Sequence, residues 1–169
     1  MNPRARIVVA ALSISAMAFV GLTIDEGYTD KAIIPTRGDV PTLGFGSTTH
    51  ADGSRVKMGD STTPVKALQR TLAYIQADEA DMRMTLAGVS LYQAEYDTFL
   101  DWRYQYGATA WRNSSMLREL KSGNYAAACH ALLRYKFSAG YDCSTPGNRI
   151  CSGVWTRQLE RHAKCMEAQ

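Results

Sequence analysis

The stretch that decides the fold is residues 24–47, IDEGYTDKAIIPTRGDVPTLGFGS. It begins with an acidic pair, Asp25 and Glu26, and ends in the pentapeptide TLGFG at positions 42–46. Glycine and proline interrupt the residues between these ends, and both residue types mark turns between short strands. The run of Gly, Pro, Thr and Asp from 35 to 60 therefore predicts a small twisted β-hairpin sheet.

This arrangement resembles the T4-type phage lysozymes (glycoside hydrolase family 24), in which a catalytic Glu at the end of a first helix precedes a T-x-G-x-G strand. Glu26 and the pentapeptide are the matching pieces, and the resemblance covers roughly residues 22–167. In the family an Asp usually lies nine residues after the Glu, and the Thr follows six residues later. Here the ninth residue is Pro35, and Thr42 lies sixteen residues after Glu26. The hairpin has gained one residue, and proline holds the usual carboxylate position.

The resemblance implies cleavage of a glycosidic bond, which needs a protonated carboxylic acid and, on the opposite face of the sugar, a group that places water. Glu26 is the acid, if a partly apolar pocket keeps its carboxyl group protonated. Thr42 holds the water through its hydroxyl. Asp39 is the nearest carboxylate that stands in for the missing Asp, and Asp30 is a weaker candidate. The alternative for Asp39 is a turn residue, because Arg-Gly-Asp before Val-Pro is typical of turns.

Composition and charge fit one globular domain. The 169 residues are 46% hydrophobic and 21% charged, which allows a sizeable core. The net charge of +3 suits a protein that acts on an anionic polymer such as the cell wall. This charge is too small and too dispersed to indicate nucleic-acid binding. We expect a monomer that works without a cofactor or a metal ion.

Residues 7–24, IVVAALSISAMAFVGLTI, carry no charge over eighteen positions, which is just long enough to cross a bilayer. Arg4 and Arg6 precede this segment, and two acidic residues follow it, so the positive-inside rule predicts a cytoplasmic N-terminus. Nine strongly apolar residues contribute about −3 to −5 kcal/mol to insertion, and eight small or hydroxylated residues oppose it. Insertion is therefore expected to be marginal and reversible.

Three interpretations of this segment remain open. A permanent anchor would be richer in Leu and Ile, and a cleaved secretory signal would use the small residues at 16–18 as its cleavage site. The interpretation that we favour is a signal-anchor-release segment, as in endolysins of lambdoid and related phages. It divides the chain into this N-terminal segment, 1–24, and a lysozyme-like catalytic domain, 25–169.

The signal-anchor-release interpretation predicts where the protein lies at each stage. The Sec machinery exports it, residues 7–24 hold it in the host inner membrane with the N-terminus cytoplasmic, and release frees it into the periplasm. Glu26 lies two residues beyond the apolar segment, so before release its carboxylate sits at the membrane surface and cannot be folded into a cleft. Release and activation are then one event.

The remainder of the chain predicts helices at 62–88, 90–106, 113–124, 125–137 and 153–167. We expect a capping box at 90–93 to open the second of these. In the first, apolar residues recur at three- and four-residue steps and form one stripe: Val65, Leu68, Leu72, Ile75, Met82 and Leu86. The implied fold class is α+β: a mostly helical, lysozyme-like fold with a small β-hairpin lobe, a long connecting helix and a C-terminal helical lobe.

All four cysteines lie between positions 129 and 165. An even number of cysteines beside an export signal favours two disulfides. Of the three possible pairings we prefer Cys143 with Cys151, which closes the loop CSTPGNRIC, and Cys129 with Cys165, which joins two helices. A zinc site that includes nearby histidines is the alternative, but the C-x2-C spacing of zinc knuckles is absent.

The function implied by the resemblance is that of an endolysin, a muramidase for host cell lysis. Its substrate would be the β-1,4 bond between N-acetylmuramic acid and N-acetylglucosamine in peptidoglycan. Two alternatives stay open. The missing Asp is compatible with a catalytically impaired, membrane-tethered protein that only binds peptidoglycan. A lytic transglycosylase would use Glu26 alone and needs no residue to place water.

Overall fold

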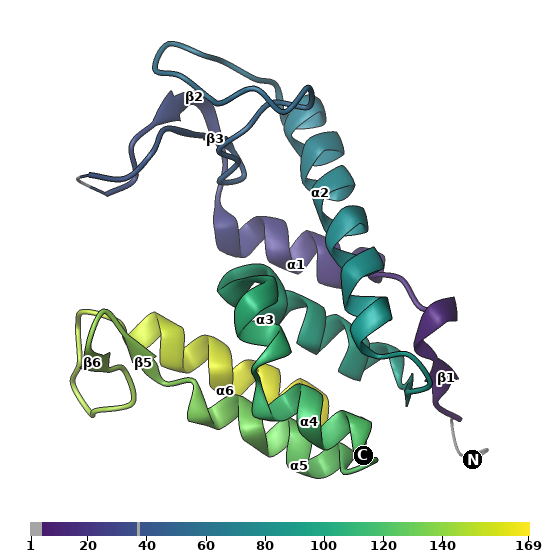
Figure 1. The fold of residues 1–169 in the computed structure, drawn as a ribbon. Helices are drawn as coiled ribbons and strands as arrows, with labels where there is room; N and C mark the ends of the chain where they lie inside the picture. Colours follow the sequence, from purple (N-terminus) through teal and green to yellow (C-terminus); the bar gives the residue numbers. More distant parts are fainter. Residues whose placement is uncertain (1–4, 37) are drawn as a thin grey trace. The chain divides into compact units, whose positions relative to one another are not determined.

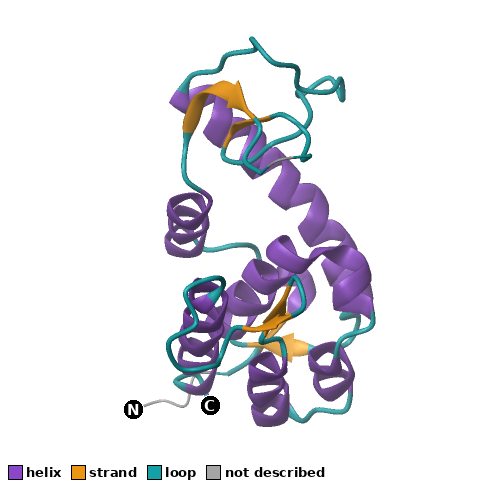
Figure 2. Cartoon of the chain, turned by 90° about the vertical axis from the view of Figure 1, so that its left-hand side faces the viewer, coloured by secondary structure: helices purple, strands orange, loops and turns teal. Residues whose placement is uncertain are grey.

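The computed structural model describes residues 5–36 and 38–169. Arg4, which precedes the apolar segment, and Arg37, in the predicted turn, lie outside this description. Helices predominate and the strands are short and antiparallel (Figures 1 and 2). The chain forms two compact units, which are described separately. We call residues 15–80 the hairpin unit, and residues 1–14 with 81–169 the helical unit.

The hairpin unit begins with helix α1, Ala16–Glu26. Its N-cap is Ser15, whose hydroxyl accepts the N–H of Ala18 at 3.1 Å and so satisfies one of the open donors of the first turn. The helix stops at Gly27, which has a φ of 69° and donates its N–H to Ile24 at 3.3 Å. Glycine adopts this left-handed conformation without a steric penalty, and the helix therefore ends directly after the acidic pair.

Strands β2, Thr29–Ile33, and β3, Thr42–Gly44, form an antiparallel pair (Figure 1). Thr29 lies opposite Gly44 and Ile33 lies opposite Thr42. The sheet therefore starts before Pro35, where we placed its beginning from the sequence, and residues 34–41 form the connection between the strands. Three buried side chains make the small core of this hairpin: Ala32, Leu43 and Val56.

Helix α2, Pro64–Thr85, occupies nearly the expected range, but the first half of its predicted apolar stripe is wrong. Val65, Leu68 and Leu72 are exposed. The buried face carries different residues: Ala67, Thr71, Ile75, Glu79 and Met82. The reason is the close approach of β3 to this helix, because a methyl group added at Gly44 would lie only 2.8 Å from the Cβ of Ala67. Only a small side chain fits where the strand meets the helix.

We expect Gly44→Ala to lower the free energy of unfolding by about 2 to 4 kcal/mol, since steric overlap adds to backbone strain. Gly44 has a φ of 67°, and the overlap is with Ala67. Urea denaturation measures the loss. Gly53→Ala is the matched control, because Gly53 also has a positive φ, 82°, but open space around an added methyl. Equal losses from the two substitutions would contradict the close packing, and Ala67→Gly should partly rescue Gly44→Ala.

The helical unit incorporates the start of the apolar segment. Strand β1, Ile7–Val8, pairs antiparallel with β4, Ser90–Leu91, and the 3-10 turn η1, Val9–Ala11, follows it. Val9 and Leu12 are buried, with 2% and 4% of their surface exposed. The Arg83 guanidinium donates to the carbonyl of Leu12 through Nε at 3.0 Å and Nη2 at 2.7 Å. Among the described residues, none of the helices has both the length and the apolar character needed to span a bilayer.

Helix α3, Gln93–Arg112, changes direction at Gly107, which has a φ of 84° and lies where we expected the helix to stop. The capping box expected at 90–93 is wrong, because Ser90 is part of β4. The first turn is closed instead by Glu95, whose Oε2 accepts the N–H of Tyr92 at 2.7 Å. Large side chains of α3 fill the core of the unit, all with at most 1% exposure: Tyr96, Phe99, Leu100, Trp102 and Trp111.

Five short elements follow. Helix α4, Ser115–Lys121, begins at the N-cap Ser114, and α5, Tyr125–Ala131, continues into the 3-10 turn η2, Leu132–Arg134. The helix predicted to reach 137 is therefore too long. Strands β5, Phe137–Ser138, and β6, Tyr141–Asp142, form a hairpin instead, because Ala139 and Gly140 have positive φ angles of 48° and 84° and make its two-residue turn.

Helix α6, Ser152–Met166, closes the chain and is held to α3 by ion pairs. Asp101 accepts hydrogen bonds from Arg157 and Arg161, each at 2.6 Å, and Arg161 is 2% exposed. Burial disfavours the charged form of Asp101, but the hydrogen bonds and charges of both arginines outweigh it and hold the pKa of this carboxyl below its usual value. These pairs fix the C-terminal helix on the core.

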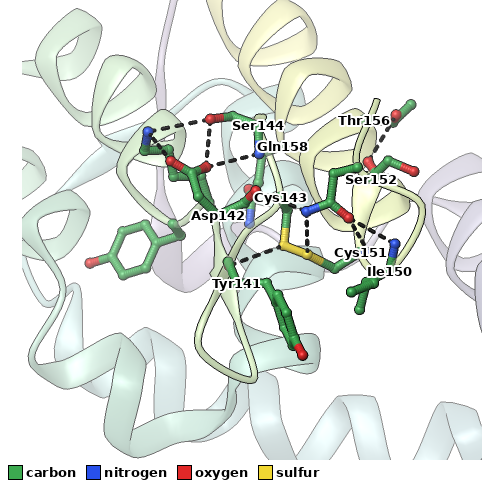
Figure 3. The surroundings of a disulfide bond; sticks show 12 residues. Tyr141, Asp142, Cys143, Ser144, Ile150, Cys151, Ser152, Thr156 and Gln158 are labelled. Atoms are coloured by element: carbon green, nitrogen blue, oxygen red, sulfur yellow. Dashed lines mark hydrogen bonds and ion pairs between the residues drawn. A yellow bond between two sulfur atoms is a disulfide. The ribbon is translucent and has the colours of Figure 1, made fainter. Parts of the chain in front are cut away.

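The two disulfides are the pairs that we prefer from the sequence. Cys129–Cys165 joins α5 to α6, with the Cα atoms 5.6 Å apart, and Cys143–Cys151 closes the loop after β6. Figure 3 shows Asp142 and Ser144 on one side of the second bond, with Ile150 and Ser152 on the other. The Asp142 carboxylate accepts from the Lys136 ammonium at 2.8 Å and from Ser144, which lowers its pKa to about 2. This loop is therefore tied both covalently and by hydrogen bonds.

Candidate active site

Glu26 is the last residue of α1, and its carboxylate lies beside the TLGFG pentapeptide. Its Oε2 is 3.6 Å from the position that a Cβ at Gly46 would occupy. Gly46 has a φ of 75°, so glycine both permits this backbone and leaves room beside the acid. The Glu26 side chain is exposed.

Thr42 is the first residue of β3 and is half-buried. It lies opposite Ile33 in the sheet, and its hydroxyl donates to the Ile33 carbonyl at 3.4 Å. This hydrogen bond is long, so a water molecule could compete for the hydroxyl. Strand β3 starts at Thr42 and ends at Gly44, and the chain then reaches Gly46 two residues later. The proposed water-holding residue is therefore four residues from the glycine beside the Glu26 carboxylate.

Asp39 lies in the connection between β2 and β3 and is exposed. Its Oδ1 accepts the N–H of Val40 at 2.8 Å, and its own N–H donates to the carbonyl of Thr36 at 2.9 Å. Both contacts belong to a turn, as the turn interpretation expects. Asp30 is exposed as well, and its carbonyl accepts the N–H of Thr62 at 2.9 Å. Both aspartates are therefore exposed residues of the hairpin unit, and these hydrogen bonds join them to the backbone of that unit.

Two aromatic residues that our sequence analysis did not single out are close in sequence to Glu26 and Gly46 and pair with each other. The rings of Tyr28 and Phe45 are 5.4 Å apart, and the Tyr28 hydroxyl donates to the Thr62 carbonyl at 3.4 Å. Tyr28 follows Glu26 by two residues, and Phe45 directly precedes Gly46. Aromatic rings offer apolar faces to sugars, so the pair can border a glycan beside the acid. The sequence did contain a signal for this pair, because Phe45 is an aromatic residue at a variable position of the T-x-G-x-G motif.

His50 supports the loop that follows the hairpin. Its Nε2 lies 2.8 Å from Oδ2 of Asp60, which also accepts the N–H of Lys57 at 2.8 Å. The backbone hydrogen bond from Lys57, and then the contact with His50, lower the pKa of Asp60. His50 therefore has a structural partner.

Comparison with known proteins identifies the family. The sequence model of the family described as Phage lysozyme matches residues 24–160, which include Glu26, Asp39 and Thr42. The chain belongs to the phage lysozyme family. It is 34% identical over 131 residues to the endolysin of Salmonella phage P22, a match that covers 78% of this chain and 88% of that protein. Membership makes the chain a lysozyme-type hydrolase, with an endolysin among its relatives.

Solved structures of phage lysozymes share the fold. A mutant of P22 lysozyme has a TM-score of 0.75 at 29% identity, covering 92% of this chain and 99% of that one. The endolysin from Escherichia coli O157:H7 phage FAHEc1 has a TM-score of 0.77 at 22% identity, covering 94% and 96%. The active form of the P1 phage endolysin Lyz has a TM-score of 0.71 at 16% identity, covering 97% and 96%. The predicted α+β, mostly helical lysozyme-like fold is confirmed.

Proposed function

We propose that this phage lysozyme is an endolysin that hydrolyses the β-1,4 bond between N-acetylmuramic acid and N-acetylglucosamine in peptidoglycan, and so lyses the host cell. The observation that carries the proposal is the position of the Glu26 carboxylate beside Gly46, with Oε2 3.6 Å from the point where a Cβ of that residue would lie. It puts a carboxylic acid beside the strand whose first residue is Thr42. Replacement of Glu26 by glutamine tests this chemistry directly.

The proposed reaction is a single displacement by water. Glu26 donates its proton to the glycosidic oxygen while the bond from that oxygen to the anomeric carbon breaks. Thr42 holds a water molecule, whose oxygen bonds to the anomeric carbon from the opposite face of the sugar. Asp39 accepts the proton that the water loses, in place of the Asp that the family usually has nine residues after the Glu. The products are two shorter glycan chains, one with a new reducing end.

Asp39→Asn tests the substitute carboxylate. We expect hydrolysis of purified peptidoglycan to fall about 100-fold, because the amide cannot accept the proton from water. The amide oxygen can still accept the N–H of Val40, so the turn and the thermal stability should be preserved. Asp30→Asn is the matched comparison, because Asp30 is the weaker candidate for the same role and an exposed carboxylate of the same hairpin unit. We expect a smaller loss of activity there, and a larger loss than in Asp39→Asn would assign the role to Asp30. Full activity of Asp39→Asn would assign Asp39 to the turn alone.

The proposal includes control by the membrane: residues 7–24 hold the protein in the host inner membrane after Sec-dependent export, and release into the periplasm activates it. The fold is compatible with two mutually exclusive states, one with residues 7–24 in the membrane and one with the start of this segment in the protein core. Val9 and Leu12 are core residues of the helical unit, and β1 pairs with β4, so the same residues cannot lie in lipid at the same time.

The fold also favours release of the intact chain over cleavage of a signal peptide. Cleavage after Ala18 would remove β1, two core side chains and the first turn of α1. The N–H of Val9, which donates to the carbonyl of Val89 at 3.0 Å, would be lost as well. A cleaved product would therefore lack β1 and two core side chains of the helical unit and the first turn of α1 in the hairpin unit.

Dissipation of the membrane potential is expected to move the protein from the membrane to the soluble fraction with lytic activity appearing at the same time. Mass spectrometry should show the intact chain. Gly21→Leu is the companion variant, because a Cβ added at Gly21 meets no neighbouring atom within 4 Å and leucine makes membrane insertion more favourable. It should stay longer in the membrane. A soluble product that begins near Phe19 would contradict release and favour a cleaved signal.

A further inference from the structure

We propose that His130 and His162 form a binding site for one divalent transition-metal cation on the helical unit. His130 lies on α5 and His162 lies on α6. Nδ1 of His130 is 3.0 Å from Nε2 of His162, and the ring centroids are 5.1 Å apart. Neither residue has a part in the proposed hydrolysis of peptidoglycan, and the inference does not depend on it.

The distance between the two nitrogens suits chelation. Imidazole nitrogens bind zinc at about 2.0 to 2.1 Å, so two of them in adjacent positions on one ion lie roughly 3.0 to 3.4 Å apart. The two nitrogens here are already within that range, joined by a hydrogen bond. Rotation of the two rings about their side-chain bonds is needed to aim both lone pairs at a common point. The hydrogen on the donating nitrogen then moves to the other nitrogen of the same ring, and the two N–metal bonds replace the hydrogen bond.

The helices that carry the histidines are held in place by a covalent bond. Cys129, the neighbour of His130, forms a disulfide with Cys165, which lies three residues after His162 on α6. Three residues correspond to almost one helical turn, so the disulfide lies beside the histidine pair. His130 is exposed and His162 is half-buried, so a hydrated cation can reach both. The ion would find its two ligands already close together, which reduces the entropic cost of binding.

The ligands indicate the class of cation. Imidazole favours copper, nickel and zinc, with Cu²⁺ the tightest in the usual order for divalent metals, whereas Mg²⁺ and Ca²⁺ prefer oxygen ligands. Within the part of the chain that the structure describes, no group of three or more His, Cys, Asp or Glu side chains is arranged around a metal position. Water would complete the coordination, and we expect reversible binding that ties α5 to α6.

Thermal unfolding and titration calorimetry of the full, disulfide-bonded chain test the site, with each metal chloride added alone. The unfolding temperature should rise with Cu²⁺, Ni²⁺ or Zn²⁺ and level off as the site saturates, with one ion bound per chain and Cu²⁺ the tightest. Mg²⁺ should have no effect, and EDTA should reverse the shift. His130→Gln and His162→Gln should each remove the saturable binding.

The chain contains three histidines, so His50 supplies a matched control. His50→Gln lies in the hairpin unit and should leave the metal response unchanged. If the half-buried His162 cannot be replaced without unfolding, the exposed His130→Gln decides the question alone. The absence of a saturable response in the unaltered chain, its survival in His130→Gln, or its loss in His50→Gln would each overturn the proposal.

Discussion

Glu26→Gln is expected to lower the rate of peptidoglycan hydrolysis by about 100- to 10,000-fold, because glutamine has the same shape but no acidic proton to transfer to the leaving oxygen. Glu26 ends α1 and is exposed, so the substitution should change the free energy of unfolding by less than about 0.5 kcal/mol. Loss of activity would then reflect chemistry and not folding. Lysis of outer-membrane-permeabilised cells and release of reducing ends from purified peptidoglycan measure the effect.

Asp25→Asn is the control for this experiment, because it removes the neighbouring charge at the same helix end. It should retain lysis, and Glu26→Gln should still sediment with peptidoglycan. Retained hydrolysis in Glu26→Gln would end the proposal for this residue. Mass spectrometry of the products from the unaltered protein distinguishes a second mechanism, since anhydro muropeptides would assign the enzyme to the lytic transglycosylases instead of the hydrolases.

Arg6→Ala is expected to lower the free energy of unfolding of the helical unit by about 3 kcal/mol, because it leaves a buried carboxylate without its counter-charge. The carboxylate is that of Glu95, which has no exposed surface. Arg6 donates to Glu95 through Nη2 at 2.9 Å and through Nε at 3.1 Å. Its guanidinium carbon also lies 4.3 Å from the ring centre of Tyr92 and 3.7 Å from that of Tyr125. Urea denaturation measures the loss.

Glu95 explains why the effect should be large. Besides Arg6, this side chain accepts the N–H of Tyr92 at the start of α3 and the side-chain amide of Gln169 at 2.7 Å. The pair therefore joins the N-terminal segment, a helix start and the C-terminus. Arg118→Ala is the matched control, because Arg118 is 65% exposed in its pair with Glu119 and should contribute less than about 1 kcal/mol.

Two further outcomes would test the contribution of the Arg6–Glu95 ion pair. Glu95→Gln combined with Arg6→Met should be less destabilised than Arg6→Ala alone, because the double variant leaves no buried charge. Equal losses of unfolding free energy from Arg6→Ala and Arg118→Ala would contradict a special contribution of the Arg6–Glu95 pair. Under the proposed release from the membrane, Arg6→Ala should also delay the appearance of lytic activity after depolarisation, because the released segment would dock less firmly.

Sequence alone determined the features that depend on a few neighbouring residues. The residues at 24–47 placed the acid at a helix end before a short strand, because glycines at 27, 44 and 46 permit the positive φ angles of the turns. Gly107 interrupts α3, and Ser114 caps α4 through its hydroxyl, both as local chemistry predicts. The preferred disulfide pairs also agree with the structure, since one closes a short loop and the other joins neighbouring helices.

Tertiary structure decided which of several plausible surfaces is buried. On α2 the three- and four-residue spacing of apolar residues favoured burial of Leu68 and Leu72, but both are exposed. Ala67 is buried instead, because Gly44 lets the backbone of β3 approach the helix closely. The start of the apolar segment is the second case. Lipid and a protein core both remove Val9 and Leu12 from water, and the hydrophobic effect does not distinguish them. The core position in this fold depends on partners distant in the sequence, β4 and Arg83, which pair with the segment's backbone.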